Sequence, residues 1–157
     1  MVIIMYIGLD LDTIDISKII ITDAMHNTVI ENSNFMRVMY SEEDVAFNGL
    51  YINCNFADST IEKYFQKYKC MFNQLTNKAL VDRMARFESE ILAAAAIPNK
   101  RRRHGLASQL SSGFVKIFTD GERASDETSM ILKISGVWEA EEEYGITYKF
   151  LISSHQL

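Results

Sequence analysis

Two aspartates directly follow an apolar stretch at the start of the chain. Residues 1–7 are apolar and lead into Gly8-Leu9-Asp10-Leu11-Asp12. Carboxylates at a strand end hold Mg²⁺ in several metal-dependent nucleases and phosphate-transfer enzymes. A two-metal centre also needs carboxylates from later elements, and the sequence contains no second D-x-D pair. A metal-dependent nuclease is therefore one alternative, and a solvated exit from a strand is the other.

Other catalytic spacings are missing from the sequence. His26, His104 and His155 stand in unrelated contexts, without H-E-x-x-H, a nucleophile elbow or a phosphate-binding Gly-x-x-x-x-Gly-Lys loop. Cys54 and Cys70 are far apart and form no C-x-x-C pair, so neither a disulfide framework nor a zinc site is indicated. We expect buried thiols, a reducing compartment, no cofactor, no metal ligand and no catalytic residue.

A basic run offers a first candidate contact for a polyanion. Lys100, Arg101, Arg102 and Arg103 follow one another directly. Four consecutive cations cannot all be paired and buried, so an exposed basic loop is predicted. Such a loop can contact nucleic acid or simply be solvated.

Aromatic residues and lysines alternate in the C-terminal third of the chain. The lysines are Lys116, Lys133 and Lys149, and the aromatic residues are Phe114, Phe118, Trp138, Tyr144, Tyr148 and Phe150. Bases of a single strand can stack on such rings for about 1 to 3 kcal/mol each while lysines contact the phosphates. The alternative is that the rings, above all Trp138, Tyr148 and Phe150, belong to the core.

Charge limits any nucleic-acid site to a local patch. The net charge is −5, which argues against a chain that coats nucleic acid by its bulk charge. Residues 139–143 (EAEEE) contain four glutamates, which favour a solvated hairpin tip. The same segment could mimic phosphate charge and compete with nucleic acid for a basic groove.

Composition and length favour one domain. The 157 residues are 48% hydrophobic, Pro98 is the only proline, and no repeat or low-complexity run occurs. We therefore predict one α+β domain over residues 1–157. The apolar start is too short for a signal peptide or a membrane span, and it predicts a strand over residues 2–8. We expect no membrane partner.

Short β-branched and aromatic runs predict a β-meander in the first third. They cover residues 16–22, 35–40 and 45–56, the last interrupted by the turn signal Asn48-Gly49.

A long helical middle is predicted next. Ser59 and Glu62 have capping-box spacing, and a stripe at three- and four-residue steps follows, made of Ile61, Tyr64, Phe65, Tyr68, Phe72 and Leu75. A second stripe repeats this spacing and comprises Leu80, Met84, Phe87 and Ile91. Because Pro98 disfavours helix at the residue before it, the helical region should end near Ala96.

The best hairpin signal lies at the end of the chain. A strand is predicted over residues 114–119, and a hairpin over residues 130–138 and 145–152. If the alternating apolar residues share one face, Ile134 lies opposite Tyr148, and Trp138 lies opposite Tyr144. The same register sets Lys133 opposite Lys149 on the outer face, and this like-charge pair is either a mild structural cost or a hint of a bound anion.

Residues 132–139 (LKISGVWE) and 144–150 (YGITYKF) resemble a small, poorly characterised protein family of nucleocytoplasmic large DNA viruses. Residues 47–51, 61–65 and 110–118 are similar to other segments of that family, so the likeness covers residues 35–151. The chain also looks like the single-stranded-DNA-binding proteins of large DNA viruses and phages in its size, its aromatic and lysine-bearing strands and its acidic total. The order of strands, helical insertion and strands suggests an OB-like barrel.

These observations lead to one functional prediction with two alternatives. The predicted protein is a non-enzymatic viral single-stranded-DNA-binding protein of DNA replication or repair. It would act inside the infected host cell, in the cytoplasm or the nucleus, or in the virion. The alternatives are a virion structural or assembly protein that binds other viral subunits or itself, and the metal-dependent nuclease. The predicted DNA contacts are Lys116, Lys133, Lys149, Lys100, Arg101, Arg102, Arg103, Phe114 and Phe118.

Overall fold

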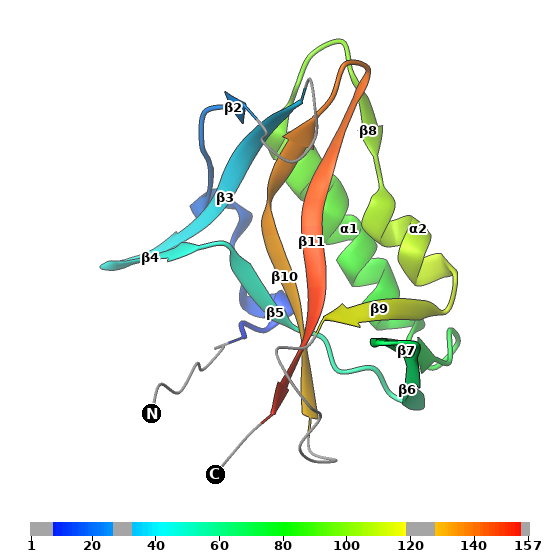
Figure 1. Cartoon of the computed structure of the whole chain (residues 1–157). Coiled ribbons are helices and arrows are strands. Elements are labelled where there is room, and N and C mark those ends of the chain that lie inside the picture. The colour runs from blue at the N-terminus through cyan, green and yellow to red at the C-terminus, as the bar shows by residue number, and fades with distance from the viewer. Residues whose placement is uncertain (1–7, 27–32, 119–127, 155–157) are drawn as a thin grey trace.

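A computed structural model of the chain describes residues 8–26, 33–118 and 128–154, and these residues form a mixed α+β fold in which strands predominate (Figure 1). The strands of the first half are β1 (Ile19–Ile21), β2 (Met25–His26), β3 (Asn34–Glu42), β4 (Val45–Asn48), β5 (Leu50–Asn53), β6 (Ser59–Tyr64) and β7 (Lys67–Phe72). The remaining elements are α1 (Lys78–Ala95), β8 (Arg101–Arg103), α2 (Gly105–Ser111), β9 (Phe114–Phe118), β10 (Thr128–Glu139) and β11 (Glu143–Ser154). Two 3-10 turns, Leu11–Thr13 and Ile16–Lys18, precede β1.

The long hairpin of β10 and β11 forms the centre of the sheet. On its side away from β11, β10 pairs with β3 along one half and with β5 along the other. On its side away from β10, β11 pairs with β8 along one part and with β9 along another, and both pairings are parallel. Helix α2 connects β8 to β9, so the sheet divides on that side into two branches.

The predicted hairpin register is correct for its first half and wrong for its second. Ile134 lies opposite Tyr148, as expected, but a β-bulge follows and Trp138 lies opposite Gly145, not Tyr144. The extra residue is Ser135, between the pairs Ile134–Tyr148 and Gly136–Thr147, and an added Cβ at Gly136 would clash with the Met36 carbonyl and the Phe35 ring. One extra residue on one strand exchanges the two faces beyond it, so Val137 enters the core and Trp138 moves to the outer face.

The described strands form an open sheet. Their order is β1-β3-β10-β11-β9-β7-β6, and β1 and β6 stand at its two ends without pairing with each other. The OB-like barrel suggested by the sequence is therefore not confirmed.

Both helices pack on one face of the sheet, where the hydrophobic core lies (Figure 1). Helix α1 contributes Met84, Phe87 and Ile91 from the predicted second stripe, all buried, whereas Leu80 is half-buried at its margin. The helix ends at Ala95 and is capped by Ala96, whose φ of 46° is typical of the left-handed residue that closes a helix. The predicted end of the helical region is confirmed.

The first half of the predicted helical middle is wrong. Residues 59–72 form the β6–β7 hairpin, and the hydroxyl of Ser59 donates to the carbonyl of Phe56 (3.0 Å) instead of capping a helix. Alternate residues Ile61, Cys70 and Phe72 face the core. This period of two competes with the helical spacing, and pairing with β9 selects it.

Two buried polar side chains fix the helices. The carboxylate of Glu88 in α1 accepts from the backbone N–H groups of Leu106 (2.8 Å) and Ala107 (3.0 Å) at the start of α2. Burial raises the pKa of Glu88 above its ordinary value, although these two donors oppose the shift. The buried amide of Asn77 bonds both backbone groups of Ala57, at 2.8 Å each, and ties the start of α1 to the chain before β6.

The other strand predictions have mixed outcomes. The predicted run 35–40 lies within β3, the run 45–56 contains β4 and β5, and the three C-terminal strands lie where expected. Only residues 19–21 of the predicted strand 16–22 are extended in a sheet. The predicted strand 2–8 lies outside the described residues except for Gly8, which is not in a strand.

Candidate nucleic-acid interface

The face of the sheet opposite the helices carries most of the predicted contact residues. Successive side chains of a strand point to opposite faces. Val115 and Ile117 of β9 are buried, so Phe114, Lys116 and Phe118 lie on the outer face. In β11 the buried Phe150 and the exposed Lys149 show the same alternation.

Four lysines form a row straight across four adjacent strands. Lys69 of β7 pairs with Lys116 of β9, and Lys149 of β11 pairs with Lys133 of β10. Phe150 pairs with Ile117 in the parallel β9–β11 ladder, so Lys116 and Lys149, one residue earlier in each strand, are also level. Neighbouring strands lie about 4.8 Å apart, so the row spans about 15 Å. We call these four residues the lysine row.

No acidic group among the described residues forms an ion pair with any member of the lysine row. Three members lie over aromatic rings instead. Lys69 Nζ is 5.6 Å from the ring centre of Tyr64 and 5.8 Å from that of Phe114. Lys133 lies 5.5 Å from Tyr51, and Lys149 lies 5.6 Å from Phe118.

A surface hollow of about 390 Å³ opens between β9 and β11, where the row crosses from one strand to the other. Lys116 and Lys149 line it together with Phe114 and Phe118, and its floor includes Tyr148. The Tyr148 hydroxyl donates to Gln109 Oε1 of α2 (2.7 Å), and burial raises its pKa to about 12. The floor is therefore neutral and fixed, and the charge lies at the rim.

The predicted basic loop is a short strand whose charges are paired. Lys100 Nζ lies 3.2 Å from Glu139, and Arg101 lies 3.7 Å from Glu142. Arg103 lies 3.0 Å from Glu143, and Arg102 Nε donates to the Tyr144 hydroxyl (2.9 Å). The predicted exposure of residues 101–103 is correct, but the predicted loop is wrong, because these residues form β8 and pair with β11 beside the acidic tip.

The pair of Lys100 and Glu139 is the least exposed of these contacts, with side chains 25% and 16% exposed. Asn34 Nδ2 also donates to Glu139 (2.9 Å). This donation, and then the nearby Lys100, hold the pKa of Glu139 below its usual value. Glu139 therefore stays charged and keeps its ion pair with Lys100.

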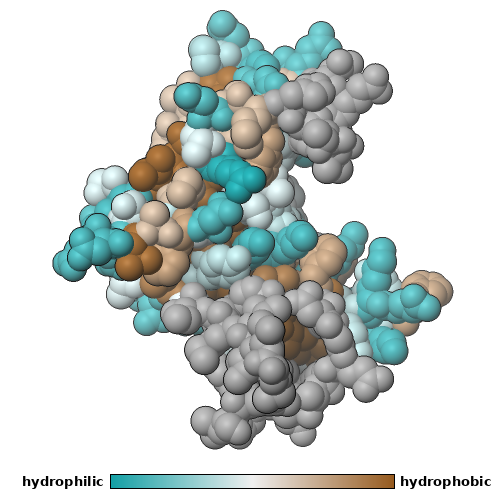
Figure 2. Space-filling model, turned by 60° about the vertical axis from the view of Figure 1, so that its left-hand side comes forward, coloured by the Kyte–Doolittle hydropathy of each residue, from teal (hydrophilic) through white to brown (hydrophobic). Residues whose placement is uncertain are grey.

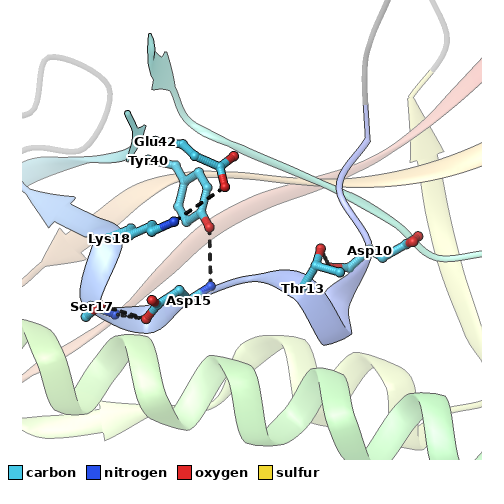
Figure 3. A network of polar contacts seen from close by, with 7 residues as sticks. All are labelled: Asp10, Thr13, Asp15, Ser17, Lys18, Tyr40 and Glu42. Atoms are coloured by element: carbon cyan, nitrogen blue, oxygen red, sulfur yellow. Dashed lines mark hydrogen bonds and ion pairs between the residues drawn. The ribbon is translucent and has the colours of Figure 1, made fainter. Parts of the chain in front are cut away.

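The aspartates near the start of the chain lie on the helix side of the sheet, away from the lysine row. Asp12 forms an ion pair with Arg83 of α1, and the exposed Asp10 accepts from Thr13 through its backbone carbonyl (2.8 Å). Figure 3 shows the segment beyond them, in which Asp15 accepts from Ser17 and its own N–H donates to the Tyr40 hydroxyl (3.3 Å). These bonds anchor the segment to β3.

Within the described residues, no group of three or more His, Cys, Asp or Glu side chains is placed to hold a metal ion. His155 lies outside the described residues, and His104 immediately precedes α2. Cys54 and Cys70 are both buried and unbridged, as expected, and burial raises the pKa of each thiol. None of the described helices is long and apolar enough to cross a membrane.

Sequence reasoning missed Lys69, Tyr64 and Tyr51 as members of the site. The first two lie in the segment predicted as helix, where Lys69 falls beside the apolar stripe. The alternation in residues 67–72 (KYKCMF) is the signal that could have found them, since it places Lys67, Lys69 and Met71 on one face.

Comparison of the chain with protein-family models, with curated proteins and with solved structures found no match. The viral resemblance therefore stays a prediction from the sequence, and the function has to be inferred from the geometry of the outer face.

Proposed function

We propose that this chain is a non-enzymatic viral protein that binds single-stranded DNA across the outer face of its sheet and serves DNA replication or repair. The lysine row carries the proposal. Phosphates would bind Lys69, Lys116, Lys133 and Lys149, while bases stack on the neighbouring rings.

The row is costly for a protein without an anionic ligand. Like charges directly opposite each other on neighbouring strands destabilise a sheet, and the row contains three such neighbours in succession. Two of the four lysines, Lys116 and Lys149, are exposed, so they reach a ligand without rearrangement of the fold. A phosphate backbone laid along the row converts this repulsion into attraction and releases counterions.

The rings beside the row favour a strand with accessible bases. A lysine over an exposed ring contributes about 0.5 to 1 kcal/mol. A base stacked on the same ring contributes about 1 to 3 kcal/mol, so exchanging the lysine for a base is favourable, and the lysine is released to a phosphate. Phe118 is 54% exposed and borders the hollow, so it is the first ring that a base would meet. Duplex DNA keeps its base faces stacked and cannot make this exchange.

A titration of the protein with labelled single-stranded DNA, duplex DNA and RNA at two salt concentrations tests this function. Fluorescence of Trp138, the single tryptophan, gives an independent signal from the outer face. We expect the single-stranded DNA to bind most tightly, with an affinity that falls as salt rises. The absence of salt-dependent binding to single strands at low ionic strength would refute the proposal.

The far end of the sheet favours a second candidate, a virion structural or assembly protein. Every residue of β4 is exposed, including Val45 (53%) and Phe47 (39%), and Ile20 of the edge strand β1 is 49% exposed. An apolar patch at a sheet edge is typical of a protein contact. Light scattering tests it: concentration-dependent assembly that is lost in Val45→Lys with Phe47→Lys would support this candidate, and a monomer at all concentrations would refute self-association.

A further inference from the structure

The β6–β7 hairpin extends past the strand that supports it. All six residues of β6 pair with β7, but β7 pairs with β9 only over residues 68–71. The turn at Phe65 and Gln66 therefore lies beyond the last described pair, Tyr68 with Ile117. Figure 2 shows an arm projecting on the right, at the height where Figure 1 places β6 and β7.

Phe65 occupies the tip in an unfavourable conformation. Its side chain is 93% exposed, and its φ is 54°, in the left-handed region that glycine and asparagine accept and bulky residues avoid. The β3–β4 hairpin has a similar turn, in which Glu43 has a φ of 46° and is followed by Asp44. A soluble turn of this geometry thus needs no aromatic ring, and the ring of Phe65 contributes no burial to the fold.

The charges around the tip match a nucleic-acid partner. Lys63 and Lys67 flank the turn, and Glu62 is the only acidic residue of the hairpin. The Tyr64 ring stands edge-on to Phe65, with centroids 6.2 Å apart. Lys69, the end of the lysine row, lies opposite Glu62 of β6 and shares a face with Lys67, which is two residues nearer the tip. A bound strand that leaves the row along β7, away from the like charge of Glu62, therefore reaches the tip.

We propose that Phe65 is a wedge that stacks on the terminal base pair where a bound single strand enters duplex DNA. This inference rests on the proposed function and adds the substrate class, a junction of single-stranded and duplex DNA. Apolar side chains inserted at base steps unstack them at a cost of a few kcal/mol, and a junction, where stacking already ends, lowers that cost. The flanking Lys63 and Lys67 would contact phosphates of the two separating strands.

The test compares a forked DNA, carrying 2-aminopurine at its first base pair, with a single strand of the same length as the fork arm. For the wild type we expect tighter binding to the fork and a rise in 2-aminopurine fluorescence.

Phe65→Asn suits the left-handed turn and removes the ring. It should reduce the preference for the fork about fivefold to a hundredfold, with single-strand affinity unchanged. Phe65→Trp should keep the preference. Leu75→Ala, another highly exposed apolar side chain, located beyond the far end of β7, should behave as wild type.

The outcomes separate this inference from the proposed function. If the wild type binds no single strand, the proposed function fails and the wedge fails with it. If single strands bind but the fork is not preferred, or if Phe65→Asn weakens both ligands equally, the wedge alone is refuted. Self-association that disappears in Phe65→Asn, without any preference for the fork, would instead assign the tip to a protein contact and would also refute the wedge.

Discussion

The chain has two basic regions that differ in what surrounds their charges. Residues 100–103 are consecutive and conspicuous in the sequence, yet three of the four have a carboxylate partner and Arg102 bonds a buried tyrosine. The lysine row is scattered over residues 69–149 and forms no described ion pair, although Glu62 of β6 lies opposite Lys69. Density of charge in a sequence and charge available to a ligand are therefore different quantities.

The difference arises from strand register. Arg101 is level with Glu143, and Arg103 is level with Gly145. The residue between these two partners, Tyr144, is buried, so Glu143 and Gly145 face outward. Arg101 and Arg103 therefore share the outer face with the lysine row. Lys149 follows Gly145 by four residues, about 13 Å along β11. The acidic tip therefore neutralises one end of a continuous basic face and leaves the other end free.

Replacing the whole lysine row should have the largest effect. Removing one phosphate contact to a single strand flattens the plot of log affinity against log salt by about 0.7, so Lys69, Lys116, Lys133 and Lys149 all changed to Gln should flatten it by about 2.8. The matched control is Arg101→Gln with Arg103→Gln, which should leave the slope unchanged because these charges are already paired. Equal reductions of the slope in the two variants would remove the distinction between the two regions.

Removing the acidic partners of Arg101 and Arg103 should make these two charges available to a ligand, as the lysine row is. Glu142→Gln with Glu143→Gln frees Arg101 and Arg103, and two new phosphate contacts would steepen the salt dependence by about 1.4. Adding Arg101→Gln and Arg103→Gln to this variant should cancel the gain. An unchanged slope in the first variant would show that the bound strand does not reach β8.

The pair of Lys100 and Glu139 should give the paired region a stability that depends on pH. Because the pKa of Glu139 is lower in the folded protein, its contribution is present above the ordinary value of 4.5 and is lost as pH falls through the folded value. Glu139→Gln should lower the free energy of unfolding by about 1 kcal/mol at pH 7, and the deficit should shrink in acid. Urea unfolding at several pH values measures it. The exposed Glu141→Gln is the control, and an equal deficit at all pH values would contradict the assignment.

The fold was predictable where local pattern and pairing agree. Asn48-Gly49 correctly marked the break between β4 and β5, and Pro98 correctly limited α1. The β6–β7 hairpin was missed because its turn, Phe65-Gln66, has no glycine or asparagine, and because its apolar residues also fit a helical stripe. Only contact with β9 decides between the two periods.

The site was predictable in its lysines and not in its geometry. The register that pairs Lys133 with Lys149 follows from alternation in a hairpin, so the sequence sufficed. The alignment of Lys116 with Lys149 depends on the parallel pairing of β9 with β11. These two strands are separated in the sequence by β10, so no local pattern encodes their pairing. The bulge between Ile134 and Gly136 was equally hidden, since Gly136 lies against Phe35 and Met36 of a strand distant in the sequence.

The smallest expected effect concerns stability, and it has opposite signs in the two regions. Lys116 lies between Lys69 and Lys149 in the row and makes none of the described lysine–ring contacts, so Lys116→Gln removes repulsion and little else. The free energy of unfolding should rise by about 0.2 to 1 kcal/mol in low salt. The gain should vanish near 1 M salt, where charges are screened beyond about 3 Å.

Arg103→Gln, which loses the exposed pair with Glu143, should lower stability by at most about 1 kcal/mol under the same conditions. Urea unfolding in low and high salt measures both variants. A lower stability in Lys116→Gln would mean that the four lysines do not repel one another, and the main reason to expect a bound anion would disappear.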